Sequence, residues 1–246
     1  MDRLVYVAMA GAKETLRAQA ANNHNLANAS TTGFRADLSA FQTQDVVGSG
    51  FPSRAYATSA GTGWDSTSGA MEATGGDLDV AIKGQGWLAV QGADGTEGYT
   101  RAGNLHVETS GMLTTASGLP VLGDSGPISV PPHASITIGG DGSLSVVPLG
   151  QEAKTVSTVG RLKLVNPPAE ALSRGPDGLF RLAAGGEAPS DASVHVVSGA
   201  LESSNVNIAV TMTTMIELSR NYDLQVKAMH TAEEDSAASA KLLQSS

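Results

Sequence analysis

Residues 207–243 read NIAVTMTTMIELSRNYDLQVKAMHTAEEDSAASAKLL, and this stretch decides the fold expected for the chain. It contains neither Gly nor Pro, although both are frequent in the residues before it. Its apolar residues recur at alternating four- and three-residue steps, which predicts one long helix with an apolar seam. The seam residues expected to pack against other helices are Ile208, Met212, Met215, Tyr222, Val226, Met229 and Leu243. A seam of this length has to be buried against a partner, so a second helix is required.

The second helix is predicted at the opposite end of the chain, over residues 3–28. Its seam has the same spacing and passes through Val5, Met9, Leu16 and Leu26. Asn-rich sequence follows, and Gly33 is a natural helix stop, because Asn favours helix ends and Gly adopts left-handed backbone conformations. Residues 1–34 and 204–246 are therefore expected to form a coiled-coil-like helical domain.

The middle of the chain has the pattern of an all-β domain over residues 75–197. Apolar and other residues alternate in short runs such as Leu78, Val80 and Ile82, and Gly-containing turn signals separate the runs. Residues 35–74 and 198–203 have no clear period and are expected to form an extended connector with at most a hairpin. The predicted fold class is α+β, with long terminal helices and a central all-β domain inserted between them.

Composition excludes several functional classes. The net charge is −9 and the pI is about 4.9, which argues against nucleic-acid binding because that binding depends on neutralising phosphates. No apolar run approaches the roughly 18 residues of a membrane-spanning helix, so membrane insertion is not expected. The absence of Cys excludes disulfides, thiol catalysis and Cys-ligated zinc. The N-terminus has no cleavable signal peptide.

Candidate catalytic residues are few. Asp77 and Asp79 could share one face of a strand, but the preceding glycines make a solvated turn the simpler interpretation. Gly84-Gln85-Gly86 lacks the remaining residues of a phosphate-binding loop, and the five His residues are scattered. We therefore predict no catalytic residue, no cofactor, no metal site and no enzymatic activity.

Three stretches together resemble the flagellar rod–hook family of axial proteins. The first contains Asn25, Leu26, Ala27 and Asn28 and continues through Gly33-Phe34-Arg35, with His24 where many members have another Asn. The second lies between Val80 and Val107 and includes Gly84-x-Gly86-Trp87 and Tyr99-Thr100-Arg101-x-Gly103. The third is Gly199-Ala200-Leu201-Glu202-x-Ser204-Asn205-Val206-Asn207. The resemblance covers nearly the whole chain and is strongest to the F-type proximal rod proteins.

The resemblance implies a structural subunit of the bacterial flagellar rod that polymerises through its terminal helices and transmits torque. It implies other proximal and distal rod proteins as partners, with self-association possible. It also implies a periplasmic basal-body location, reached through the flagellar type III export apparatus without cleavage. The alternatives are a distal rod subunit, a β-domain module that recognises a ring protein or a glycan, and a secreted hydrolase with an unrecognised site.

Overall fold

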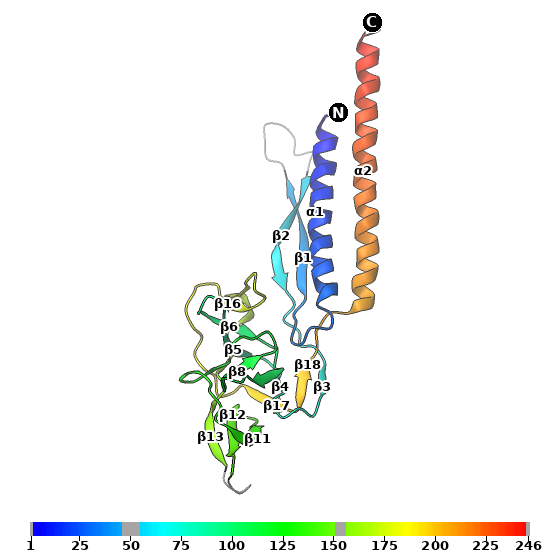
Figure 1. Cartoon of the computed structure of the whole chain (residues 1–246). Coiled ribbons are helices and arrows are strands. Elements are labelled where there is room, and N and C mark those ends of the chain that lie inside the picture. Colours follow the sequence, from blue (N-terminus) through cyan, green and yellow to red (C-terminus); the bar gives the residue numbers. More distant parts are fainter. Residues whose placement is uncertain (1, 46–54, 151–155, 245–246) are drawn as a thin grey trace. The chain divides into compact units, whose positions relative to one another are not determined.

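The computed structural model describes residues 2–45, 55–150 and 156–244 of the chain (Figure 1). These residues form two compact units. The helical unit contains residues 1–29, 36–65 and 206–246, and the β unit contains residues 30–35 and 66–205. None of the described helices combines the length and apolarity needed to span a membrane.

The helical unit is built on two helices, α1 (Asp2–Ala27) and α2 (Ile208–Gln244). They are antiparallel, because Asn22 of α1 donates a hydrogen bond to the Thr211 carbonyl while Gly11 of α1 lies against Gln225, farther along α2. Figure 1 shows that α2 continues past the N-terminal end of α1. The C-terminal part of α2 therefore has no cover from α1.

The predicted coiled-coil-like helical domain is wrong, although the two terminal helices and the α+β class agree with the structure. The buried residues of the helix pair are mostly small or polar; they are Ala8, Ala12, Glu14, Thr15 and Ala18 on α1 and Thr211, Leu218 and Ala232 on α2. Four residues of the predicted seams, Met9, Leu16, Ile208 and Met212, are instead between 48% and 53% exposed. A coiled coil inserts large apolar side chains into its partner, whereas large seam residues of both helices are exposed here.

A hairpin completes the helical unit. Strands β1 (Asp37–Asp45) and β2 (Ala55–Trp64) pair antiparallel, from Asp37 opposite Trp64 to Asp45 opposite Ala55. The register shifts between Ser39 and Phe41, which marks a bulge. In Figure 1 the hairpin runs alongside α1. Most of the segment expected to be an extended connector is thus paired strand.

The β unit contains many short strands joined by tight turns. Its helical turn is η1 (Ala169–Ala171), and its strands are β3 (Met71–Ala73), β4 (Val80–Lys83), β5 (Trp87–Gln91), β6 (Glu97–Thr100), β7 (Leu105–Val107), β8 (Leu113–Thr115), β9 (Leu122–Gly123), β10 (Gly126–Pro127), β11 (His133–Ile138), β12 (Ser143–Pro148), β13 (Ser157–Arg161), β14 (Leu164–Val165), β15 (Leu172–Arg174), β16 (Phe180–Leu182), β17 (His195–Ser198) and β18 (Ala200–Glu202). A five-stranded sheet has the order β14-β5-β6-β16-β15, and a three-stranded sheet has the order β11-β12-β13. The remaining strands form the antiparallel pairs β17–β4, β18–β3, β7–β8 and β10–β9.

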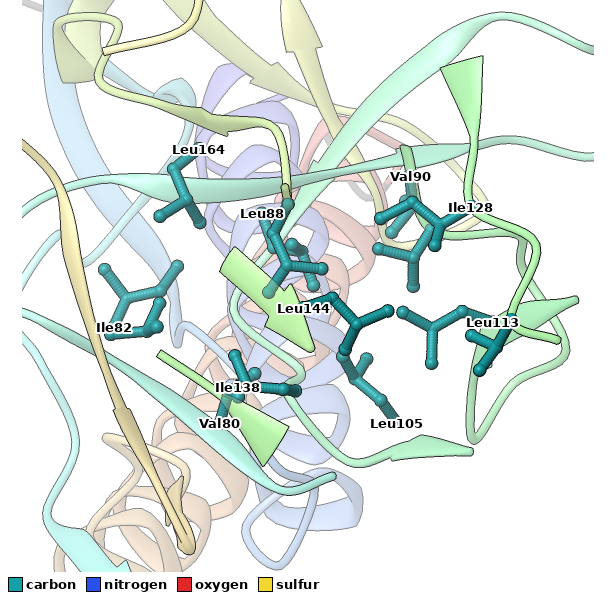
Figure 2. Packing of buried hydrophobic residues seen from close by; sticks show 14 of the residues in the cluster. Val80, Ile82, Leu88, Val90, Leu105, Leu113, Ile128, Ile138, Leu144 and Leu164 are labelled. Carbon is teal, nitrogen blue, oxygen red and sulfur yellow. The ribbon is translucent and has the colours of Figure 1, made fainter. Parts of the chain in front are cut away.

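One apolar core fills the β unit. Strands of the β unit contribute apolar residues at two-residue steps, such as Val80 and Ile82 from β4 and Leu144 and Val146 from β12. Figure 2 shows Val80, Ile82 and Leu144 converging with side chains of other strands, among them Leu88, Val90, Leu105 and Leu113. The buried Tyr99 hydroxyl accepts a hydrogen bond from the Ala188 amide at 2.6 Å, and burial raises the pKa of Tyr99 to about 12. The β unit therefore has a core of its own.

Candidate assembly surface and ionic cluster

An apolar stripe lies on α1, away from its contact line with α2. Val5, Met9 and Leu16 follow one another at steps of four and seven residues, which places them on one side of the helix. Met9 and Leu16 are exposed and Val5 is partly buried. Leu4 and Tyr6 add further exposed apolar area near the start of the helix.

Two apolar stripes lie on α2, one on each side of its contact line with α1. Thr211 is buried on that line, and each residue turns a helix by about 100°, so Val210 and Met212 point to opposite sides of it. Ile208, Met212 and Ile216 continue one stripe at four-residue steps, and Leu224 lies almost four turns beyond Val210 on the other. All five side chains are exposed, between 48% and 60%. Together with the α1 stripe they form what we call the assembly surface.

The other predicted packing residues lie at or near the helix contact. Leu26, Met215, Tyr222, Val226 and Met229 are partly buried, and the side chain of Leu243 lies outside the described residues. Their role in subunit packing stays a prediction.

Asn residues of the first motif hold the end of α1 to β1. The Asn25 side chain donates to the Asp37 carbonyl at 2.9 Å and accepts from the Asp37 amide at 2.7 Å. The Asn28 side chain donates to the His24 carbonyl, and the His24 ring lies 2.5 Å from the Asp37 carboxylate. An amide can donate and accept at once, so Asn satisfies the exposed peptide groups at this helix end.

The rest of the first motif and the third motif meet inside the β unit. The Gly33 amide donates to the Glu202 carbonyl at 2.7 Å, and the Asn205 amide donates to the Phe34 carbonyl at 3.3 Å. Gly33 has a φ of +68°, and a Cβ at this position would lie 2.3 Å from the Arg101 carbonyl carbon. Gly is therefore needed both for the backbone conformation and for the close approach.

Three charged residues, one from each motif, form a buried ionic cluster. The Glu202 carboxylate lies 2.7 Å from Arg35 and 2.9 Å from Arg101, and the three side chains are 1%, 1% and 4% exposed. Arg101 also donates to the carbonyls of Ile82 and Gly84. Burial lowers the pKa of Arg101, and the charge of Glu202 opposes that shift. The Glu202 carboxylate thus forms ion pairs with two buried guanidinium groups.

An aromatic and guanidinium stack adjoins the ionic cluster. The Arg174 guanidinium lies 4.8 Å from the ring centres of both Phe34 and Phe180, and it donates to the Arg35 carbonyl. The Phe180 ring packs on Trp87 with 4.6 Å between centroids, and Arg101 lies 5.6 Å from the Trp87 ring centre. Cation–π contacts therefore connect β15, β16 and β5 to residues 34–35.

The ionic cluster was not predicted from the sequence. Arg35, Arg101 and Glu202 stand inside the three family motifs, but the charge pairing between positions so far apart was not inferred. Arg174 lies in no motif. A usable signal was present, because Arg35, Arg101 and Glu202 each stand close to Gly and to small or apolar residues, with two Arg against one Glu.

The candidate carboxylate Asp79 takes part in a turn, as Asp94 and Asp141 do. Asp79 accepts from the Thr74 hydroxyl at 2.5 Å. Asp94 and Asp141 each accept from the hydroxyl and amide two residues ahead, and these hydrogen bonds lower the pKa of both carboxylates. Within residues 2–45, 55–150 and 156–244, no three His, Asp or Glu residues are grouped as metal ligands would be.

Comparison with known proteins identifies the family. Residues 81–146 match the flagellar hook protein FlgE/F/G D1 domain, and residues 197–242 match the flagellar basal body rod FlgEFG protein C-terminal domain. The chain is 45% identical over 249 residues to the flagellar basal-body rod protein FlgF of Escherichia coli K12, covering 99% of each chain. The chain belongs to the flagellar basal-body rod proteins of the F type. It is a structural subunit of the rod and a component of the flagellar basal body, and this family is structural rather than enzymatic.

Other relatives agree with this assignment. The rod subunit is 43% identical to FlgF of Salmonella typhimurium LT2 over 249 residues, covering 99% of each chain. It is 31% identical to the rod protein FlgG of Bacillus subtilis 168 over 260 residues, covering 95% of the subunit and 96% of FlgG. The C-terminal match includes the last residues of β17, all of β18 and most of α2, so it spans both Glu202 and the α2 stripes.

Proposed function

We propose that the rod subunit binds its neighbours through the assembly surface on α1 and α2. The observation that carries this proposal is the burial pattern of the two helices. Small residues such as Ala8 and Ala12 are buried, while larger residues such as Leu16 and Met212 are exposed. Exposed apolar patches on a soluble protein mark interaction sites.

The proposed partners are other rod subunits, both copies of this chain and the adjoining rod proteins. The two α2 stripes differ in residues and lie on opposite sides of the α1 contact line. Two unlike surfaces favour head-to-tail contacts over a symmetric dimer. Head-to-tail contacts build either a closed ring or an open helical polymer. Torque would then pass from subunit to subunit through the helices.

We further propose that the subunit reaches the periplasm through the flagellar type III export apparatus and works there. The absence of Cys from the sequence supports this route, because no disulfide has to be broken or avoided during export. The alternative partners of the β unit are ring proteins and glycans.

The test uses cells that lack the native copy of the gene. We expect these cells to stop swimming, and the full chain supplied from a plasmid should restore swimming and appear in purified basal bodies. A photoreactive residue in place of Leu16 should cross-link to rod proteins. A deletion strain that swims as its parent does, or cross-links to export or ring proteins alone, would contradict the proposal.

A further inference from the structure

The chain passes between the helical unit and the β unit at four points, after residues 29, 35, 65 and 205. Three short segments of the β unit adjoin these points: residues 30–35, residues 66–69 and residues 203–205. We call them the crossing segments. The ionic cluster of Arg35, Arg101 and Glu202 belongs wholly to the β unit.

Hydrogen bonds join the crossing segments to one another. Arg35 donates to the Thr67 carbonyl at 2.5 Å, and the Asn205 side chain donates to the same carbonyl at 3.0 Å. The Asn205 amide donates to the Phe34 carbonyl. Each crossing segment is therefore bonded to the other two.

Glu202 is the residue on which these bonds converge. Its carbonyl accepts from the Gly33 amide, and its carboxylate accepts from the Gly69 amide at 3.0 Å and pairs with Arg35. The third segment follows Glu202 directly in the chain. The Glu202 side chain is 1% exposed, so its charge is compensated by Arg35 and Arg101 rather than by solvent.

We propose that the ionic cluster locks the crossing segments together, and that Glu202 is the positioning residue of this lock. The apolar cluster of the β unit includes no residue of 30–35 or 66–69, and Phe34 joins the β unit through its contact with Arg174. Arg101 keeps two backbone carbonyl partners when Glu202 is neutral, and Arg35 reaches water when its segment detaches. Loss of the Glu202 charge therefore opens the crossing segments while the core persists.

The lock has a mechanical consequence that rests on the proposed rod function. Force applied to either terminal helix enters the β unit through a crossing segment. Because the segments are bonded to one another, that force is shared among them instead of pulling one segment out of the β unit.

The test is amide hydrogen exchange on the free full-length chain, which does not depend on rod assembly. In Glu202→Gln, the amides of Gly33, Gly69 and Asn205 should exchange at least about tenfold faster than in the wild type. Core amides such as Val90 and Leu144 should keep their wild-type rates. Glu72→Gln is the matched control, because Glu72 is exposed and lies opposite Leu201 in the strand that pairs with β18.

A second variant, Arg35→Met, keeps the apolar length of the side chain and removes its charge. It should also speed exchange at Gly33 and leave the core amides unchanged. Wild-type rates at Gly33, Gly69 and Asn205 in both variants would overturn the inference. Loss of protection throughout the β unit would overturn it as well, because the cluster would then be part of the core fold rather than a separable lock.

Discussion

Replacing Met212 with Asp should block incorporation of the subunit into rods while the β unit stays folded. Met212 is 51% exposed in the free chain, so the free subunit tolerates the charge. Once a neighbour covers this stripe, the carboxylate is buried without a partner, which costs several kcal/mol. Since about 1.4 kcal/mol is a factor of ten in binding, we expect incorporation to fall by at least roughly a hundredfold.

The measurement is the amount of subunit in basal bodies purified from cells that express only the variant. Leu149→Asp is the matched control, because it places the same charge at an exposed apolar position that lies in the β unit and outside the assembly surface. Leu149 is 64% exposed, so the charge stays in water there. Equal incorporation of Met212→Asp and Leu149→Asp would argue against the assembly surface.

Replacing Leu144 with Ala should lower the free energy of unfolding of the β unit by about 2–5 kcal/mol. Leu144 is fully buried, and Figure 2 shows it between Leu88, Ile138 and Leu105. The substitution removes contacts from several strands and leaves a cavity, because close-packed neighbours relax only partly.

Leu149→Ala is the control for this substitution, because Leu149 follows β12 directly and is 64% exposed. Its effect should stay within about 0.5 kcal/mol. Urea titration of the full-length variants, followed by a probe in the β unit such as Trp87 fluorescence, gives both values. Similar losses for the two variants would show that the β unit does not depend on this core.

The sequence predicted the terminal helices well because their signals are local. The expected helix over residues 3–28 corresponds to α1 at Asp2–Ala27, and the Gly- and Pro-free stretch corresponds to α2. The face of each helix that meets the other was not predicted. The sequence seam passes through Met9 and Met212, which the structure leaves exposed. Contacts between the helices instead join Gly11 to Gln225 and Asn22 to Thr211.

Features that depend on distant residues were harder to infer. Strands β1 and β2 are rich in Ser, Thr, Gln and Ala, so they show little apolar alternation, and their pairing register cannot be read from either strand alone. Arg35 and Glu202 are separated by most of the chain, and single-sequence patterns carry no sign that two such charges meet. The short strands of the β unit were easier, because Gly turns such as Asp94-Gly95 and Asp141-Gly142 mark their ends.

The central claim is that neighbouring subunits complete the burial of α1 and α2. The helix pair buries mainly small side chains, and the part of α2 beyond Ala232 consists largely of exposed residues. Isolated helical segments of this kind are marginal in water. We therefore expect the terminal helices of the free subunit to open readily and to become stable on assembly.

Amide hydrogen exchange on dilute subunit and on assembled rods tests this claim most directly. Residues 5–26 and 208–240 should exchange at least about tenfold more slowly in rods, which corresponds to about 1.4 kcal/mol of added protection. Core amides of the β unit, such as those of Val90 and Leu144, should exchange equally slowly in both samples. Strong protection of the two helices already in dilute subunit, unchanged in rods, would contradict the account.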